Sequence, residues 1–281
     1  MELQLEAIRE QQKASWNNFS PGWKKWDDLT MDFLKPMGDE IIRMLKPKNN
    51  EMILDVAGGT GEPGLTIASM INGGKVFITD IAEGMLEIAE ENAMLRGIKN
   101  IEARICDVCE LPFDDETFDA ISCRKGFMFF PDMALAAKEM VRVLKPGGRI
   151  SASVWDGPEK NFWVTAIMGT ISRNMELPPL PPGAPGMFRC ATDGFMVELF
   201  SKAGLKNIYQ NIIPGKLNSK TTDVYWEMMT EVGAPIVAAL SNADDVMIAK
   251  IKAEVYEIVN RRYPDGNVII DCSSIVVYGE K

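Results

Sequence analysis

Ile53-Leu54-Asp55-Val56-Ala57-Gly58-Gly59-Thr60-Gly61-Glu62-Pro63-Gly64 predicts a buried parallel strand, a glycine-rich turn and the start of a helix. Consecutive apolar residues suit a strand that is covered on both faces. Glycines let the backbone approach a ligand where a Cβ would collide. The helix that follows points its free N–H groups at whatever lies in the turn. We therefore expect a nucleotide site at this turn.

The identity of that nucleotide has two interpretations. Residues 59–64 match the G-x-G-x-x-G pattern of dinucleotide-binding folds, and Asp80 follows roughly 20 residues later, where an acid that binds ribose belongs. Three features favour a smaller, cationic nucleoside. Asp55 lies inside the strand, where a carboxylate brings nothing to a pyrophosphate, and Pro63 removes an N–H from the helix start. Asp107 then adds a third acid after the next predicted strand.

At these positions the sequence resembles the class I S-adenosylmethionine-dependent methyltransferases, and within them the ubiquinone/menaquinone-biosynthesis C-methyltransferases. The resemblance covers roughly residues 37–155. Its motifs follow one another in the family's order: Asp55–Gly61, Thr79–Ile81 with Gly84–Leu86, Glu110–Phe113 with Thr117–Asp119, and Val143–Arg149. The resemblance implies an α/β fold with a Rossmann-like seven-stranded sheet, helices on both faces, and S-adenosyl-L-methionine as the cofactor.

The resemblance also implies which residues hold the methyl donor. The expected donor-binding residues are Asp55, Ala57, Gly58, Gly59, Gly61, Asp80, Ile81, Met85, Cys106, Asp107, Val108, Cys123 and Arg124. Asp80 would take both ribose hydroxyls, unless it only caps the next helix. Asp107 and the Val108 N–H would read the adenine edge, while Cys123 and Arg124 would face the methionine part. Met85 lies either under the adenine or in the core.

Composition narrows the chemistry. The chain of 281 residues carries a formal net charge of −10, which opposes nucleic-acid binding and favours a small-molecule partner. It contains no histidine, so Ser-His and Cys-His nucleophiles and His-based metal sites are excluded. Methyl transfer from a sulfonium suits this limit, because the enzyme mainly aligns two reactants and excludes water. No catalytic base follows from the sequence.

Cysteine usage and hydropathy point to a compartment. Five scattered cysteines, no secretory signal and no apolar run of bilayer length favour a soluble cytoplasmic enzyme. Cys106-x-x-Cys109 has metal or redox spacing, but no second pair completes a site, so we expect no metal. The acidic run Asp114–Glu116 is expected to be a solvated turn. The oligomeric state stays open, a homodimer included.

We expect one methyltransferase domain over residues 1–281. It would comprise an N-terminal helical arm (1–36), a donor-binding core (37–155) and two helical cap or lid insertions (156–205 and 214–266). Within these parts we expect a new helix at Ser20-Pro21, a break at Lys35-Pro36, a stiff proline-rich connection at 178–186, a helix cap at Thr192, a helix break at 233–235, and an antiparallel edge formed by strands 206–213 and 268–277.

Aromatic residues outside the shared motifs are the candidates for acceptor binding. Trp16 and Trp23 either pack the arm against the domain or wall the pocket. Phe127 follows the fourth predicted strand and could form an apolar wall. Tyr225 and Trp226 belong either to the core or to the underside of a lid. The expected acceptor is a small, hydrophobic or aromatic metabolite, methylated on carbon or oxygen.

Two other functions compete with this hypothesis. An NAD-dependent oxidoreductase would explain the glycine pattern, although no Tyr in the chain is followed four residues later by Lys, as short-chain dehydrogenases require. A non-catalytic S-adenosylmethionine-binding regulator would share the donor site but transfer no methyl group.

Overall fold

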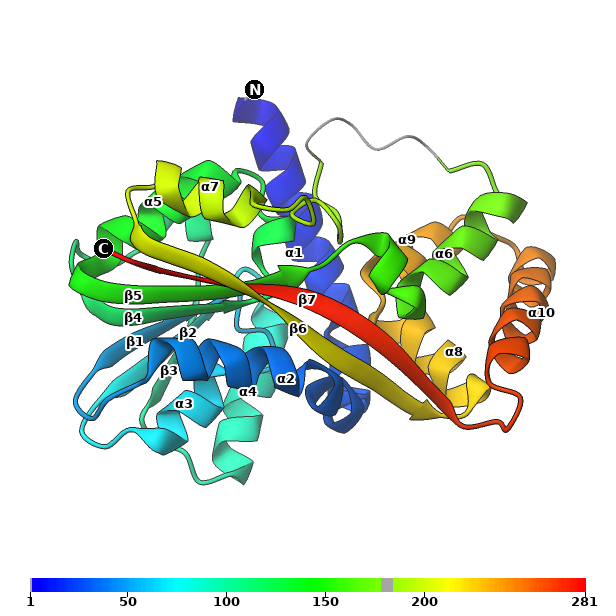
Figure 1. Cartoon of the computed structure of the whole chain (residues 1–281), viewed down its shortest axis with the longest axis horizontal. Helices are drawn as coiled ribbons and strands as arrows, with labels where there is room; N and C mark the ends of the chain where they lie inside the picture. Colours follow the sequence, from blue (N-terminus) through cyan, green and yellow to red (C-terminus); the bar gives the residue numbers. More distant parts are fainter. Residues whose placement is uncertain (1, 178–183) are drawn as a thin grey trace.

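The computed structural model describes residues 2–177 and 184–281 and contains one seven-stranded sheet in the order β3-β2-β1-β4-β5-β7-β6 (Figure 1). The strands are β1 (Met52–Val56), β2 (Lys75–Asp80), β3 (Ile101–Ile105), β4 (Phe118–Arg124), β5 (Leu144–Trp155), β6 (Lys206–Lys220) and β7 (Val268–Glu280). Strands β1 to β5 pair in parallel, and β7 runs antiparallel to both of its neighbours. The predicted fold class is confirmed. Six residues of the predicted proline-rich connection, 178–183, lie outside the described residues.

Helices cover both faces of the sheet (Figure 1). They are α1 (Glu2–Lys25), α2 (Asp27–Leu45), α3 (Gly64–Met70), α4 (Glu83–Leu95), α5 (Met133–Val143), α6 (Phe162–Asn174), α7 (Phe195–Lys202), α8 (Thr222–Val232), α9 (Ala234–Leu240) and α10 (Asp245–Arg262). Successive strand residues point to opposite faces. Ile53 accordingly belongs to the cluster under α2 and α3, whereas Leu54 belongs to the larger cluster with α5 and α7. None of the described helices is long and apolar enough to cross a membrane.

The N-terminal helices are longer than predicted, and the expected boundaries at two prolines are wrong. α1 continues through Pro21 and α2 continues through Pro36, although each proline removes one helical hydrogen bond. Packing around the prolines offsets that loss, because Phe19 is nearly buried and Met37 is fully buried. The chain breaks instead at Trp26, whose indole Nε1 donates to Glu231 over 2.9 Å.

The last two strands form a long ribbon that carries the C-terminal helices. β6 continues to Lys220, so residues 214–220 belong to a strand and not to the predicted insertion. We call helices α6, α8, α9 and α10 the cap. They gather around the end of the ribbon where β6 ends and β7 begins (Figure 1). The break between α8 and α9 falls at Gly233, as predicted. Thr192 is not a helix cap, since α7 begins after Gly194, which has a φ of +74°.

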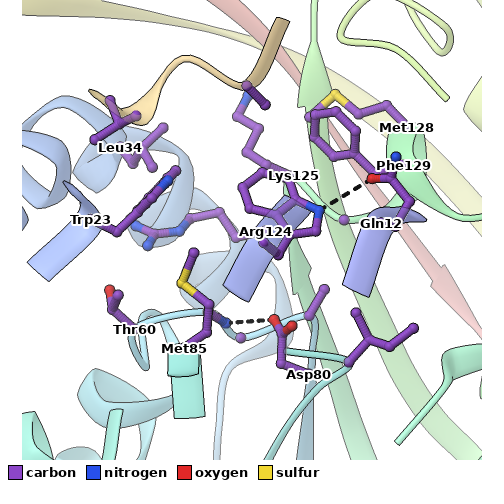
Figure 2. Close-up of a pocket in the computed structure, with 18 of the residues that line it drawn as sticks. Gln12, Trp23, Leu34, Thr60, Asp80, Met85, Arg124, Lys125, Met128 and Phe129 are labelled. Atoms are coloured by element: carbon purple, nitrogen blue, oxygen red, sulfur yellow. Dashed lines mark hydrogen bonds between the residues drawn. The ribbon is translucent and has the colours of Figure 1, made fainter. Parts of the chain in front are cut away.

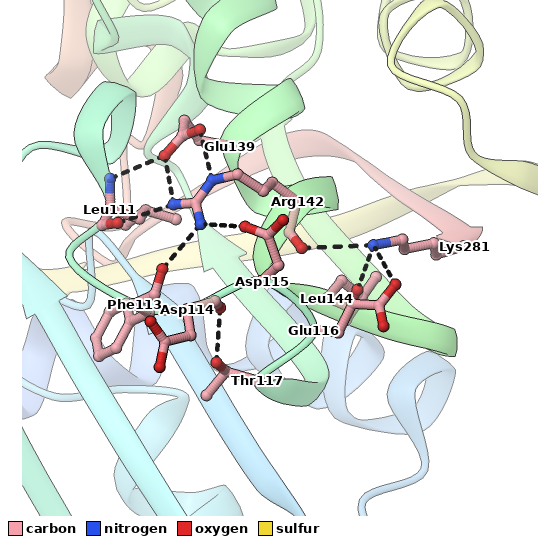
Figure 3. Close-up of polar contacts among 10 residues, drawn as sticks. All are labelled: Leu111, Phe113, Asp114, Asp115, Glu116, Thr117, Glu139, Arg142, Leu144 and Lys281. Carbon is pink, nitrogen blue, oxygen red and sulfur yellow. Dashed lines mark hydrogen bonds and ion pairs between the residues drawn. The ribbon is translucent and has the colours of Figure 1, made fainter.

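The acidic run lies at the amino end of β4 and is exposed, as predicted. The Asp115 and Glu116 side chains are 74% and 53% exposed. Arg142 donates to Asp115 and to the carbonyl of Phe113, both over 2.8 Å, and Lys281 lies 3.8 Å from Glu116 (Figure 3). In the described part of the chain, no group of three acidic, Cys or His side chains could hold a metal ion.

Candidate active site

A cavity lies beyond the carboxyl ends of the parallel strands, where open α/β sheets bind their ligands. The strand ends and the loops that follow them line it with Ala57, Gly58, Gly59, Thr60, Asp80, Ile81, Cys106, Asp107, Val108, Arg124, Lys125 and Gly126. Helices and strand β5 add Gln12, Trp16, Trp23, Thr30, Phe33, Leu34, Met85, Trp155, Trp163, Met228, Met229 and Val232. The empty space between these residues, the open mouth included, is about 1390 Å³.

The glycine turn after β1 packs its backbone onto β2. The Gly58 N–H donates to the carbonyl of Thr79 over 3.0 Å, and a Cβ on Gly58 would lie 2.5 Å from Ile78 Cγ2. Gly59 has a φ of +55°, and a Cβ built there would meet no described atom within 4 Å. Gly61 has a φ of +113° but does not line the cavity. The turn therefore presents bare backbone to the cavity at Gly59.

Asp80 sits at the end of β2 and is tied to this turn. Its Oδ2 accepts from the Gly59 N–H over 3.1 Å and its Oδ1 from the Ala82 N–H over 3.0 Å, and Figure 2 shows the carboxylate beside the turn. Desolvation raises the pKa of Asp80 above the ordinary value. The hydrogen bonds from backbone N–H groups lower this pKa, but by less than desolvation raises it. The N-cap of α4 is Ala82, so the alternative role for Asp80 as that cap is not observed.

Residues after β3 form the next wall, which α1 closes from outside. Asp107 Oδ1 accepts from the Cys109 N–H over 2.9 Å, and Oδ2 pairs with Arg9 of α1. Burial raises the pKa of the Cys106 thiol to about 11, so it is uncharged at neutral pH. The Arg9 pair was not predicted, since nothing in the sequence of α1 shows that the helix reaches the loop after β3.

Asp55 lies behind the cavity and not in it. It is fully buried, its Oδ1 accepts from Ser122 Oγ over 2.6 Å, and its Oδ2 accepts from the Gly64 N–H over 3.0 Å. Desolvation raises its pKa from 3.8 to about 7. Asp55 therefore joins β1 to β4 and to the start of α3, and the expectation that it faces the ligand does not agree with its position.

The two residues that end β4 have different surroundings. Cys123 is fully buried outside the cavity, under Gly126, and burial raises the pKa of its thiol. Arg124 lines the cavity and donates from Nη2 to the Met31 thioether over 3.2 Å, which is the one hydrogen bond that its side chain makes within the described residues. Its pKa is lowered by desolvation, while the nearby carboxylates of Glu62 and Asp55 favour its charge. A charged guanidinium thus faces the cavity with its donors largely unused.

The N-terminal arm folds over the cavity. The interpretation that Trp16 and Trp23 wall the pocket agrees with this position, since both line the cavity. Trp16 contacts Trp23 and Phe129 edge to face, with ring centroids 6.3 and 5.2 Å apart. The buried Trp23 Nε1 has no hydrogen-bond partner in residues 2–177 and 184–281. Met85 lies beneath this arm in a small cluster with Phe19.

Three expected acceptor residues do not line the cavity. Phe127 is fully buried against Phe130 and Phe200, 5.2 and 5.7 Å between ring centroids. Tyr225 is fully buried too, and its hydroxyl donates to the Trp163 carbonyl over 2.7 Å. Trp226 is 6% exposed and belongs to the main core.

The cap reaches the cavity one turn further along α8, through Met228 and Met229. Phe33, Trp155 and Trp163 complete that wall, with ring centroids 4.7 to 5.5 Å apart. These three aromatic residues come from α2, β5 and α6 and share no motif, so sequence reasoning missed them. Lys125 was missed as well, although it directly follows Arg124, which was expected to face the methionine part of the donor.

The sheet order with an antiparallel β7 defines a Rossmann-like methyltransferase fold and differs from the six-stranded 3-2-1-4-5-6 order of dinucleotide-binding domains. A solved structure, the YcgJ protein from Bacillus subtilis, aligns with a TM-score of 0.59 over 87% of this chain and 97% of its own. At 19% sequence identity this likeness concerns the fold alone.

Comparison with known sequences gives matches to the core of the chain. Residues 27–161 match the ubiE/COQ5 methyltransferase family. The ubiquinone/menaquinone biosynthesis C-methyltransferase UbiE of Cellvibrio japonicus is 40% identical over 117 residues, which are 41% of this chain and 47% of the relative. The demethylmenaquinone methyltransferase of Bacillus subtilis is 34% identical over 137 residues, which are 48% of this chain and 54% of the relative. The chain thus spans about half the length of the curated relatives it matches.

Residues 27–161 are thus similar to the ubiE/COQ5 methyltransferases, and the predicted resemblance over roughly residues 37–155 is confirmed. The match ends at residue 161, before all four helices of the cap. The sequence matches are therefore confined to the core, whereas the likeness in fold extends over most of the chain.

Proposed function

We propose that the protein binds S-adenosyl-L-methionine in this cavity and transfers its methyl group to a small, hydrophobic or aromatic acceptor. The observation that carries the proposal is the placement of Asp80 and Asp107 at the ends of β2 and β3, beside the bare backbone of Gly59. Carboxylates beside an exposed backbone suit a nucleoside that carries hydroxyls and an amine.

The residues present fit the donor group by group. Asp80 already accepts one N–H on each oxygen and keeps lone pairs for the two ribose hydroxyls. Asp107 and the Val108 N–H suit the adenine edge. The exocyclic amine of the adenine would share Asp107 Oδ2 with Arg9. The guanidinium of Arg124, with only a thioether as acceptor, suits the carboxylate of the methionine part.

Catalysis would need little proton chemistry from the chain. The donor, when bound, supplies a methyl group that is already activated on a sulfonium. The chain's residues would align the acceptor with it and keep water out, which can lower a barrier substantially without a general base. The aromatic and methionine side chains of α1, α2, β5 and α8 that wall the cavity support an apolar acceptor.

Two measurements test this proposal. Calorimetric titration with S-adenosylhomocysteine and with NADH should show binding of the first and none of the second. Incubation with methyl-labelled donor and pooled small metabolites should give a labelled product that enters an organic solvent. Tight NADH binding without S-adenosylhomocysteine binding would contradict the proposal. Donor binding with no labelled product would favour the non-catalytic regulator.

A further inference from the structure

Three consecutive residues join the arm to α2 and contact two other parts of the protein. Lys25 ends α1, Trp26 forms the break between the helices, and Asp27 begins α2. The Lys25 Nζ and the Trp26 Nε1 donate to the two carboxylate oxygens of Glu231 on α8, over 2.7 and 2.9 Å. Asp27 Oδ1 accepts from Thr60 Oγ1 over 3.1 Å. The junction therefore touches the cap on one side and the glycine turn after β1 on the other.

The contact between the junction and the cap is close. A Cβ on Gly22 would lie 2.7 Å from the backbone oxygen of Glu231, so α1 and α8 meet at their backbones. Glu231 lies in the last turn of α8, where the helix dipole disfavours a carboxylate. Desolvation acts to raise the pKa of Glu231, but the hydrogen bonds from Lys25 and Trp26 bring this pKa below its ordinary value. These two donors therefore stabilise an acid at a helix end that does not itself favour one.

Of the two donors, the indole of Trp26 makes the stronger contact. The Lys25 side chain is 54% exposed, so water and salt screen most of its attraction to Glu231. The bond from Trp26 Nε1 is partly buried, and a hydrogen bond to a charged acceptor is stronger than one to a neutral acceptor. The indole also packs against the main core. Trp26 therefore fixes the direction in which the chain enters α2.

The other side of the junction reaches the turn that borders the cavity. Thr60 is buried, lies in the turn and lines the cavity (Figure 2). Its two neighbours, Gly59 and Gly61, both have positive φ angles and would tolerate other backbone shapes. The Thr60 hydroxyl donates to Asp27, and its carbonyl accepts from Asn92 of α4 over 3.0 Å. These contacts of Thr60 hold the turn in one shape.

We propose that Glu231 is a positioning residue for the donor site. Through Trp26 and Asp27 it fixes the shape of the glycine turn. Neither Glu231 nor Asp27 is among the residues that line the cavity, whereas Val232, the next residue on α8, does line it. The position of the cap and the order of the donor turn are therefore linked. This inference rests on the proposed function, because it assigns to a cap residue an effect on donor binding.

Hydrogen exchange of the ligand-free, full-length protein tests this link directly. We expect Glu231→Ala to speed exchange of the backbone amides of residues 57–66 by about two- to tenfold, which corresponds to the loss of one hydrogen bond. The matched control is Glu227→Ala, at an exposed acid one turn earlier on α8, which should exchange like the wild type. Glu231→Gln can still accept from Trp26 and should lie between the two. The amides of β7 should be unchanged and report an intact fold.

A double-mutant cycle separates this path from a general loosening of the cap. Asp27→Ala removes the carboxylate that Thr60 contacts and should speed exchange in the same turn. Adding Glu231→Ala to Asp27→Ala should change the turn by less than about twofold, because the path is already cut. Additive effects of the two changes would overturn the inference. Unchanged exchange of the turn in Glu231→Ala would overturn it too, as would an equal acceleration in Glu227→Ala.

Affinity for S-adenosylhomocysteine, measured by calorimetry on the same proteins, reports on the donor site. Glu231→Ala should weaken binding by about two- to tenfold, and Glu227→Ala should bind like the wild type. Equal affinity of the wild type and Glu231→Ala would contradict the inference and leave the proposed function intact. A wild type that binds no S-adenosylhomocysteine would overturn the proposed function and, with it, the role at a donor site. The exchange experiment would then still decide whether the cap and the turn are linked.

Discussion

Replacing Asp55 by Asn should make the protein more stable at alkaline pH. The carboxyl group is fully buried, and its pKa of about 7 in the folded chain compares with 3.8 for the ordinary group. Asn keeps both contacts, because its oxygen can accept from the Gly64 N–H and its amide can donate to Ser122 Oγ. The change therefore removes a buried charge without emptying the site.

The magnitude follows from proton linkage. Between pH 3.8 and about 7 the folded chain holds this proton while the unfolded chain has lost it, so wild-type stability falls as pH rises. Each unit costs about 1.4 kcal/mol, and the window of about three units gives about 4 kcal/mol. The group adds no further pH dependence above about 7. We expect Asp55→Asn to match the wild type near pH 4 and to exceed it by about 4 kcal/mol at pH 8.

Urea unfolding from pH 4 to 8, without ligand, measures this difference. The matched control is Asp114→Asn, at an exposed carboxylate in the acidic turn, which should follow the wild type at each pH. The reasoning is refuted if Asp55→Asn is the less stable protein at pH 8, or if its stability changes with pH in parallel with the wild type. Affinity for S-adenosylhomocysteine should change only a few-fold, since Asp55 does not line the cavity.

Three further substitutions test other parts of the site. Arg124→Met should weaken S-adenosylhomocysteine binding by about tenfold or more in calorimetry, because a charge-assisted pair with the ligand carboxylate is worth roughly 1.5–3 kcal/mol; unchanged affinity would remove Arg124 from the donor site. Gly58→Ala should lower the free energy of unfolding by about 1–3 kcal/mol, since its Cβ would lie 2.5 Å from Ile78 Cγ2, and a fully stable variant would be a contrary result. Tyr225→Phe should cost about 1 kcal/mol in urea unfolding by losing its bond to the Trp163 carbonyl, while leaving affinity for the donor analogue intact; a large loss of affinity would argue against its core position.

The end of the cavity that we propose for the donor was predictable in its position because it depends on local sequence. A strand, a glycine turn and an acid at the end of the next strand lie close together in the chain, and parallel strands bring their ends to one edge. Asp80, Asp107 and Gly59 therefore fall where the sequence placed them. Asp55 lies one layer deeper, because both of its oxygens are used inside the protein, which no motif reveals.

The end of the cavity that we propose for the acceptor was not predictable because it depends on tertiary packing. Phe33, Trp155 and Trp163 meet only after α2, β5 and α6 fold together. On α8 the Met and aromatic residues share one helical pattern, and the pattern does not say that Met229 reaches the cavity while Tyr225 stays in the core. The proline boundaries of α1 and α2 failed for the same reason, since packing outweighs a lost hydrogen bond.

Calorimetric titration of Asp80→Ala and Asp107→Ala with S-adenosylhomocysteine tests the central claim most directly. Each change removes a carboxylate from a strand end that borders the cavity, and a hydrogen bond to a charged group contributes roughly 1.5–3 kcal/mol. The account predicts at least about a tenfold loss of affinity for each variant, with Asp114→Ala unchanged and all three proteins folded. Wild-type affinity in both strand-end variants would contradict it.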